Sequence, residues 1–364
     1  RTEAYDGSSW SSKSDMTTAR SNSGGDGTQT TAIVFGGHNT STALNATEEY
    51  NEFSEPASFQ NVGQVFYNDT EKKFKVTSAT AVGAWATSVV VPTAVRASAG
   101  AGTQTAGLLF GGEASPGSQN ATYEYNGNFW TAGGNLSTAR SQLGGTGTQT
   151  AGLAFGGAPP TTGTTEEYGG TSWTSGGTMG TARYIFGSAG TQTAGLAFAG
   201  LTSTTVTNTE EYDGSSWTAG GAYPFAVNDL RGSGTQTAAL GMGGNPPASG
   251  YSSLTREYNG SSWSEGGSLN TARAMHSSSG TQTANLVYGG EGPPELNATE
   301  EYDGTSFTTS PATMGTARKR MASNIGTTSA SALAAAGQVG SSSKDNTEEY
   351  SGPGALQIED IDVT

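Results

Sequence analysis

The stretch TEEYDGSSWTAGG, residues 209–221, places Tyr212 and Trp217 five residues apart on either side of a short polar segment. Near copies occupy residues 165–177 and 299–307. A DG or NG dipeptide between two apolar runs is a strong signal for a hairpin turn. A motif that recurs in every unit is typical of architecture, so we expect function where the copies differ.

A second motif sets the length of the repeat. GTQT begins at six glycines and a degenerate GTTS at a seventh: Gly27, Gly102, Gly147, Gly190, Gly234, Gly280 and Gly326. The intervals of 75, 45, 43, 44, 46 and 46 residues indicate seven modules of about 45 residues, one with an insertion. Each module has short apolar runs between Gly-, Asn- and Asp-rich turns and lacks helical periodicity, which predicts four strands per module.

Seven four-stranded modules predict an all-β fold, a single seven-bladed β-propeller over residues 1–350. Its aromatic anchors are expected to pack between blades: Trp10, Trp85, Trp130, Trp173, Trp217, Trp263 and Phe307. The last module ends after TEEY with no Trp to follow. We therefore expect the N-terminal strand that carries Trp10 to complete the C-terminal blade and close the ring, which would hide two sheet edges.

The order of a glycine doublet, a Tyr, a Trp and an Arg in each module resembles the kelch repeat. In that family the doublet ends the second strand, the Tyr lies on the third and the Trp on the fourth. The wording TEEYDGSSWTAGG…TAR…GTQTAGLAFGG also resembles kelch-like structural and tail-fibre proteins of marine bacteriophages of the cyanophage type. That resemblance implies a non-enzymatic structural or attachment protein, located on the virion or outside the cell.

Glutamate and arginine recur in register. A Glu stands just before the Tyr at Glu49, Glu124, Glu167, Glu211, Glu257, Glu301 and Glu349, and an Arg stands in the TAR stretch at Arg20, Arg140, Arg183 and Arg273, with Arg96 and Arg318 nearly in register. We expect these residues to form structural ion pairs, one per blade; the alternative is solvated faces that contribute little. One module has Val227 at the arginine position, and Arg231 or Arg256 is the candidate substitute.

One module differs from the rest by an insertion at about residues 51–84. Its sequence GQVFYNDTEKKFKVT predicts a β-hairpin over residues 63–77. The hairpin carries Lys72, Lys73 and Lys75, half of the lysines in the chain, and is either a contact arm for a partner or a cover for a blade edge. The C-terminal tail, residues 351–364, is expected to leave the ring, and self-association through the tail or the insertion stays an open alternative.

The second variable region lies between the glycine doublet and TEEY of each module. Propeller geometry gathers these loops on one face, and loops on a rigid scaffold are where recognition usually sits. The binding candidates on this face are His38, Glu113, Tyr251 and Glu291. Because the loop tips are short and polar, we expect the partner to be a host-surface glycan or another virion protein.

Composition limits the chemistry. A net charge of −15 disfavours a nucleic-acid partner, the lack of Cys excludes thiol catalysis, and no apolar run is long enough for membrane insertion. The two histidines, His38 and His276, fall at different module positions and propose no metal site, and we expect no cofactor. The chain begins with Arg1 rather than Met, so we expect it to be part of a longer polypeptide.

Unpaired carboxylates keep two other functions open. A glycosidase needs two unique carboxylates across a pocket, and the non-repeated candidates are Glu113, Glu291, Glu295 and Asp229. The first alternative is therefore an extracellular carbohydrate-active enzyme on a propeller scaffold. The second is a purely structural assembly or decoration module.

Overall fold

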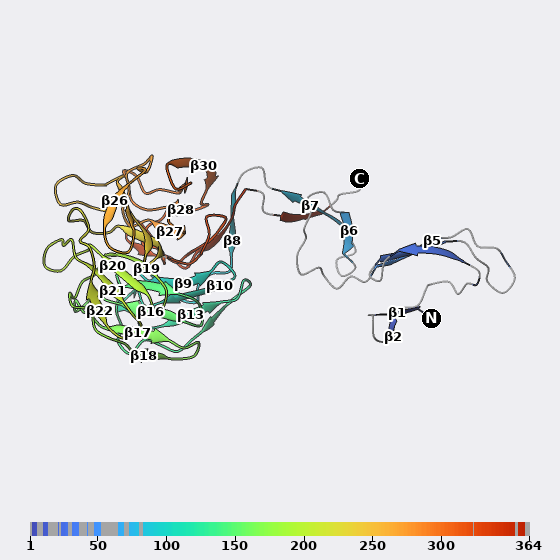
Figure 1. Cartoon of the computed structure of the whole chain (residues 1–364), viewed down its shortest axis with the longest axis horizontal. Coiled ribbons are helices and arrows are strands. Elements are labelled where there is room, and N and C mark those ends of the chain that lie inside the picture. The colour runs from blue at the N-terminus through green and yellow to red at the C-terminus, as the bar shows by residue number, and fades with distance from the viewer. Residues whose placement is uncertain are drawn as a thin grey trace. The chain divides into compact units, whose positions relative to one another are not determined.

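The structure, a computed structural model, describes residues 83–322 and 324–353 throughout (Figure 1). Elsewhere it describes strands β1–β7 and β35, with the single residues Ser21, Ser23 and Thr42. The chain divides into two compact units, one of Arg1–Thr77 with Ile358–Thr364 and the other of Ser78–Gln357. All regular elements in the described residues are strands, as the sequence predicts.

The unit Ser78–Gln357 is a β-propeller with six blades (Figure 1). Blades 1 to 5 are antiparallel sheets of four strands, and in each sheet the strands lie side by side in the order in which the chain forms the blade. Blade 6 has three strands. The strands are, in blade 1, β9 (Ala99–Thr103), β10 (Ala106–Phe110), β13 (Thr122–Tyr125) and β14 (Trp130–Ala132); in blade 2, β15 (Gly144–Gly147), β16 (Gly152–Phe155), β17 (Thr165–Tyr168) and β18 (Trp173–Ser175); in blade 3, β19 (Gly187–Gly190), β20 (Gly195–Phe198), β21 (Thr209–Tyr212) and β22 (Trp217–Ala219); in blade 4, β23 (Arg231–Thr235), β24 (Ala238–Met242), β25 (Thr255–Tyr258) and β26 (Trp263–Gly266); in blade 5, β27 (Ser277–Gly280), β28 (Asn285–Tyr288), β29 (Ala298–Tyr302) and β30 (Phe307–Thr313); and in blade 6, β31 (Ser331–Ala335), β34 (Thr347–Ser351) and β8 (Ala84–Ser88). Short two-stranded pairs lie in the loops of blade 1, β11 (Glu113–Ala114) with β12 (Gly117–Ser118), and of blade 6, β32 (Gln338–Val339) with β33 (Ser342–Ser343).

The quoted repeat folds as its turn chemistry predicts. Tyr212 lies opposite Trp217 across the hairpin of β21 and β22. Asp213 begins the turn, and its Oδ1 accepts hydrogen bonds from the backbone N–H groups of Ser215 and Ser216 at 2.8 Å each. Gly214 has a φ of 91°, a left-handed conformation that favours glycine. The turn therefore fixes the register that places Tyr and Trp side by side.

The sixth blade is completed by β8, which precedes blade 1 in the chain. Tyr350 of β34 lies opposite Trp85 of β8, the pairing that Tyr212 and Trp217 have in blade 3. The strand of Trp10, β2 (Trp10–Lys13), instead pairs with β1 (Thr2–Tyr5). The prediction of seven blades completed by the Trp10 strand is therefore corrected to six blades with β8 at that edge. A hairpin to Tyr5, five residues away, closes a far shorter loop than a pairing to Tyr350, so its entropic cost is lower.

The other sheets include the remaining module. Strands β3 (Gly24–Gly27), β4 (Thr31–Phe35) and β5 (Thr47–Asn51) form a three-stranded sheet. Strands β6 (Val65–Asn68) and β7 (Lys73–Ala79) are antiparallel neighbours, which confirms the predicted hairpin. The tail contributes β35 (Leu356–Asp360), which lies beside β7. The six blades thus span Ala84–Ser351, whereas the predicted propeller spans residues 1–350.

The hydrophobic core lies between blades, as the aromatic repeat predicts. In one cluster Leu108 and Phe110 of blade 1 pack with Tyr168 of blade 2, and Trp173 lies against them. The ring centroids of Trp173 are 4.9 Å from those of both Phe110 and Tyr168. Trp85, Trp217 and Trp263 are held in the same way, between their own tyrosine and the aromatic residue that ends the second strand of the preceding blade. Trp130 contacts its own Tyr125 and packs in a cluster with Ala335, which ends the second strand of blade 6. Each blade therefore needs its neighbour to complete its core.

Candidate functional site

The glutamate just before each tyrosine binds the next blade. Its carboxylate accepts a hydrogen bond from the tyrosine hydroxyl of the following blade, for example from Tyr212 to Glu167 at 2.5 Å. The donors and acceptors are Tyr168 to Glu124, Tyr212 to Glu167, Tyr258 to Glu211, Tyr302 to Glu257, Tyr350 to Glu301 and Tyr125 to Glu349. The last of these joins blade 1 to blade 6, so the set passes through all six blades. Burial first, and then the hydrogen bond to Glu167, raises the pKa of Tyr212 to about 12.

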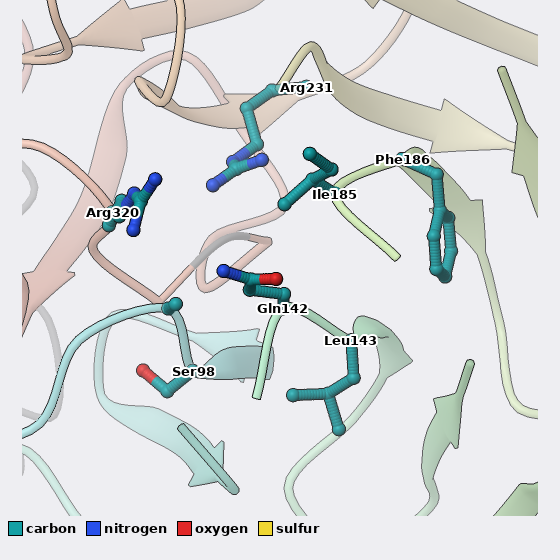
Figure 2. A pocket seen from close by; sticks show the side chains of 8 residues that line it. Ser98, Gln142, Leu143, Ile185, Phe186, Arg231 and Arg320 are labelled. Atoms are coloured by element: carbon teal, nitrogen blue, oxygen red, sulfur yellow. The ribbon is translucent and has the colours of Figure 1, made fainter. Parts of the chain in front are cut away.

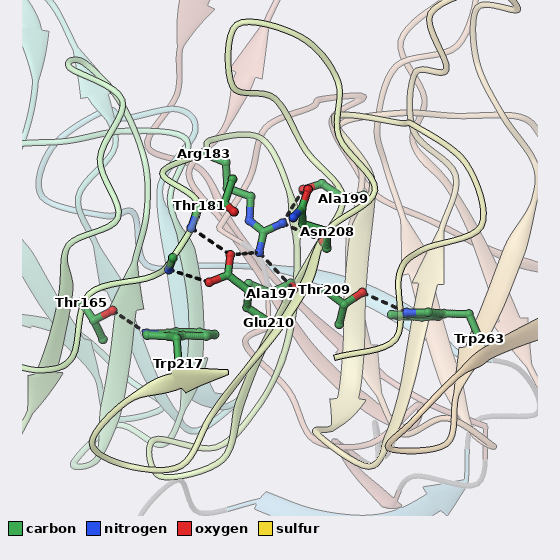
Figure 3. Close-up of polar contacts among 11 residues, drawn as sticks. Thr165, Thr181, Arg183, Ala197, Ala199, Asn208, Thr209, Glu210, Trp217 and Trp263 are labelled. Atoms are coloured by element: carbon green, nitrogen blue, oxygen red, sulfur yellow. Dashed lines mark hydrogen bonds and ion pairs between the residues drawn. The ribbon is translucent and has the colours of Figure 1, made fainter. Parts of the chain in front are cut away.

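The tryptophans make a second set of contacts between blades. The indole Nε1–H of each Trp donates to the threonine that begins the third strand of the preceding blade, as Trp217 does to Thr165 at 2.9 Å (Figure 3). The other pairs are Trp85 with Thr299, Trp130 with Thr347, Trp173 with Thr122, and Trp263 with Thr209. Blade 5 has Phe307 at this position, and Thr255 Oγ1 is buried without a hydrogen-bond partner in the described part of the chain. The tryptophan therefore supplies both packing and a specific hydrogen bond.

The repeated arginines form buried ion pairs, but with a different glutamate from the one predicted. Arg183 pairs with Glu210, two residues before the tyrosine, at 2.8 Å, and both side chains are buried (Figure 3). The equivalent pairs are Arg140 with Glu166, Arg273 with Glu300, and Arg318 with Glu348. Successive side chains of a strand point to opposite faces. The two glutamates of TEEY therefore have different partners, an arginine of the same blade and a tyrosine of the next.

Blades 1 and 4 lack this pair: blade 1 has Tyr123 at the glutamate position, and in blade 4 both partners change together. Val227 replaces the arginine and Arg256 replaces the glutamate. Arg256 is buried, lies over the ring of Phe225 at 5.4 Å and pairs with the exposed Glu265 at 3.2 Å. The joint change indicates that the pair is one structural unit. Since these repeated residues hold the blades, they leave the non-repeated residues as candidates for function.

A circuit of backbone hydrogen bonds marks the mouth of the propeller axis. Just before each inner strand one residue adopts a left-handed conformation: Ala97, Gln142, Ile185, Asp229, Met275 and Arg320. The backbone N–H of each of these residues donates a hydrogen bond to the backbone carbonyl of the equivalent residue in the preceding blade. Gln142 donates to Ala97 in this way, and Ala97 donates to Arg320 at 2.8 Å. The circuit thus returns to the blade at which it starts.

The variable loops surround this mouth. We call their side of the propeller the loop face, formed by residues 111–121, 156–164, 199–208, 243–254, 289–297 and 336–346 between the second and third strands. The residue before each left-handed residue forms a β-bridge with such a loop, for example Ala274 with Glu291 and Lys319 with Gln338. The predicted gathering of these loops is therefore present in the six blades.

Non-repeated charges collect at one side of the mouth. Lys319 pairs with Glu291 at 2.6 Å and with Glu295 at 3.2 Å. Asp229 is buried, and burial raises its pKa while Arg231 and Arg320 act to lower it. Burial and the charge of Glu291 also raise the pKa of Tyr251. Tyr251 and Glu291, two sequence-predicted binding residues, thus share one electrostatic neighbourhood.

An axial hollow opens among the left-handed residues. It is lined by Ala97, Ser98, Gln142, Leu143, Ile185, Phe186, Arg231 and Arg320 (Figure 2). In Figure 2 the side chains of Arg231, Arg320 and Gln142 reach toward the same space from different connections. This site was not predicted from the sequence, where Arg231 is considered only as a substitute for the missing repeated arginine. The available signal is that Arg231 occupies a register position held elsewhere by small residues.

The other predicted site residues have diverse environments. Glu113 forms an ion pair with Arg96 at 2.7 Å. Among the described residues, no contact joins Glu113 to Tyr251. His38, Lys72 and Arg20 lie outside the described residues. For Lys73, Glu49 and Trp10 the structure describes the strand backbone alone; these residues lie on β7, β5 and β2. Lys75, also on β7, is half-buried. The binding roles of His38, Glu113, Tyr251 and Glu291 stay predictions.

His276 is a buried side chain beside the mouth. Neither ring nitrogen has a hydrogen-bond partner among the described residues, and burial followed by the charges of Arg273 and Arg231 lowers its pKa well below the usual value. The imidazole is therefore neutral. Among the described residues no group of three or more His, Cys, Asp or Glu side chains is placed to hold a metal ion.

Comparison with known proteins does not assign the chain to a family. The chain matches no protein-family model and no curated protein sequence. Among the residues that the structure describes, no helix has the length and apolar character needed to cross a membrane. What the fold and the site define is a six-bladed β-propeller with a charged axial mouth on its loop face.

Proposed function

We propose that this propeller is a non-enzymatic virion structural or attachment protein of kelch type that presents its loop face to a host-surface glycan or to another virion protein. One observation carries the proposal: the repeated polar residues bind blade to blade, whereas the non-repeated Tyr251, Glu291, Lys319, Arg231 and Arg320 gather around the axial mouth. Polar side chains that the fold does not use, gathered where loops lie on a rigid scaffold, are typical of recognition.

The ion pairs support a binding role over a catalytic one. Glycoside hydrolysis needs one carboxylic acid and one carboxylate facing a sugar across a pocket. Glu291 and Glu295 both hold Lys319, and Glu113 holds Arg96. Three of the four non-repeated carboxylates are thus engaged with cations. A rigid ring with such a mouth is suited to holding a ligand in place.

A binding screen tests the proposal. The intact chain is assayed on a glycan array and on intact cells of candidate hosts, beside a variant with the loop of residues 245–254 scrambled. The matched control is Ser215→Lys in a turn between third and fourth strands, on the opposite face. We expect binding that the scrambled loop removes and the control retains. Binding that survives the scrambled loop, or hydrolysis of an arrayed glycan, would overturn the proposal.

A further inference from the structure

We propose that the axial hollow binds the carboxylate of an acidic sugar residue between the guanidinium groups of Arg231 and Arg320. This inference rests on the proposed glycan-binding role of the loop face and names the chemistry of its ligand. Arg231 and Arg320 line the same hollow and reach into it from blades 4 and 6 (Figure 2).

The position of Arg231 departs from the pattern of the repeat. At the same register position, two residues after the left-handed residue, the other blades have Ala99, Gly144, Gly187, Ser277 and Ala322. Inner strands of a propeller are crowded, and a long charged side chain there costs packing and desolvation. Local departures from an otherwise consistent architecture are expected at functional sites.

The two arginines have more donors than the described residues satisfy. Arg231 Nε is buried without a hydrogen-bond partner, and its Nη1 donates only to the neighbouring backbone carbonyl of Leu230 at 3.1 Å. Arg320 Nε lies 3.2 Å from Met275 Sδ, which is a weak acceptor. Neither guanidinium forms an ion pair within 4 Å of a described carboxylate. An oxyanion in the hollow would supply the missing acceptors.

The pairing of the charges leaves the two arginines with one carboxylate between them. Glu291 and Glu295 both pair with Lys319. Asp229 is the carboxylate whose charge acts on both Arg231 and Arg320. Because three cations and three carboxylates balance over these six groups, the preference for an anion rests on the free guanidinium donors rather than on a net positive charge. A planar carboxylate matches the geometry of guanidinium N–H pairs and binds them bidentately.

The other lining residues suit a sugar. Ser98 and Gln142 offer hydroxyl and amide groups for sugar hydroxyls, while Leu143, Ile185 and Phe186 provide an apolar wall for a ring face. The enclosed space of the hollow is small, about 20 Å³, and the hollow opens to solvent. It therefore fits the carboxylate group of a terminal residue, with the sugar ring where the hollow opens to solvent. An acidic peptide or a polyanion is disfavoured because the chain carries a net charge of −15, which repels a ligand with many negative charges.

Titration calorimetry with the intact chain tests the inference. The probes are glucuronate, its methyl ester, glucose and glucose 6-sulfate at low salt. We expect glucuronate to bind with a Kd on the order of 1 mM and the other three at least about tenfold more weakly, since one charge-assisted contact is worth about that factor. Equal binding of the sulfate or the ester would overturn the carboxylate assignment.

Variants distinguish bidentate binding of the carboxylate by a guanidinium group from non-specific electrostatic attraction. Arg320→Lys keeps the charge and loses the planar donor pair, so we expect at least about tenfold weaker binding of glucuronate. Arg256→Gln, at a buried arginine outside the hollow, should bind like the wild type. The melting temperature of each variant shows that it is folded. Unchanged affinity in a folded Arg320→Lys variant would overturn the inference.

The result is distinguishable from the test of the proposed function. One outcome is array binding that depends on the loop of residues 245–254 but shows no preference for acidic glycans and no effect of Arg320→Lys. That result would contradict the carboxylate inference and would still support the attachment role. Calorimetric binding of glucuronate without any binding to arrays or cells supports the site and sinks the attachment role.

Discussion

Replacing Phe307 by tryptophan should stabilise the propeller. Five blades pair an indole Nε1–H with a threonine hydroxyl at 2.9 to 3.3 Å. Blade 5 has Phe307 instead, so Thr255 Oγ1 is buried without a partner among the described residues. Met242 lies in the cluster with Phe307, where blades 1, 2, 3 and 5 have an aromatic residue, and methionine adapts readily to a changed neighbour. The larger indole therefore has space.

The magnitude follows from the hydrogen bond. A new intramolecular hydrogen bond contributes about 1 kcal/mol net, and it also relieves the cost of an unpaired buried hydroxyl. For a unit of this size, about 1 kcal/mol raises the melting temperature by about 2–4 °C. We expect Phe307→Trp to show this gain in urea unfolding and in thermal melts.

Two threonine variants provide the matched control. Thr255→Val in the wild type should be neutral or slightly stabilising, because its hydroxyl has no partner to lose. Thr165→Val should cost about 1–2 kcal/mol, because it leaves the indole Nε1–H of Trp217 unpaired. The reasoning is refuted if Phe307→Trp brings no gain and the two threonine variants cost the same.

Two further predictions concern buried polar groups. Arg183→Ala leaves Glu210 buried without its partner and should cost about 3–5 kcal/mol, whereas Lys344→Ala should change the free energy of unfolding by less than about 0.5 kcal/mol; equal effects in urea titrations would show that the pair is idle. Burial and hydrogen bonds to glutamate raise the pKa of Tyr168 and of Tyr212 to about 12. Their stabilising contribution is complete below about pH 10, the ordinary tyrosine pKa, and is lost as the pH rises through about 12. The part of the tyrosinate absorbance that Tyr168→Phe removes should therefore rise together with unfolding, and a rise of that part near pH 10 without loss of structure would contradict this expectation.

The repeat allowed the blade, but not the ring, to be predicted from sequence. Turn chemistry and spacing are local properties, so the strand pairing of Tyr212 with Trp217 and the hairpin of β6 and β7 could be read directly. Two segments, those of Trp10 and Trp85, carry the same fourth-strand pattern. The choice between them depends on long-range pairing and chain connectivity, which a single sequence does not encode in any short motif.

The polar contacts were predicted in kind but not in partner. Register alone could not tell which glutamate of TEEY faces the arginine, because the two neighbours point to opposite sides of the strand. Arg183 contacts Glu210, and Glu211 contacts Tyr258 of the next blade. The axial mouth could not be predicted because it is assembled from six distant connections. Its sequence signal was a single arginine, Arg231, at a position of small residues.

The most direct test of the six-bladed arrangement is a disulfide across blade 6. The chain has no native cysteine, so introduced pairs report unambiguously. Ala84 and Ser351 lie opposite each other in the register that pairs Trp85 with Tyr350, and opposed strand residues satisfy the Cα separation that a disulfide needs. We expect Ala84→Cys with Ser351→Cys to oxidise rapidly within one chain. Rapid oxidation of Ser9→Cys with Ser351→Cys in its place would put the Trp10 strand in blade 6 and contradict the six-bladed account.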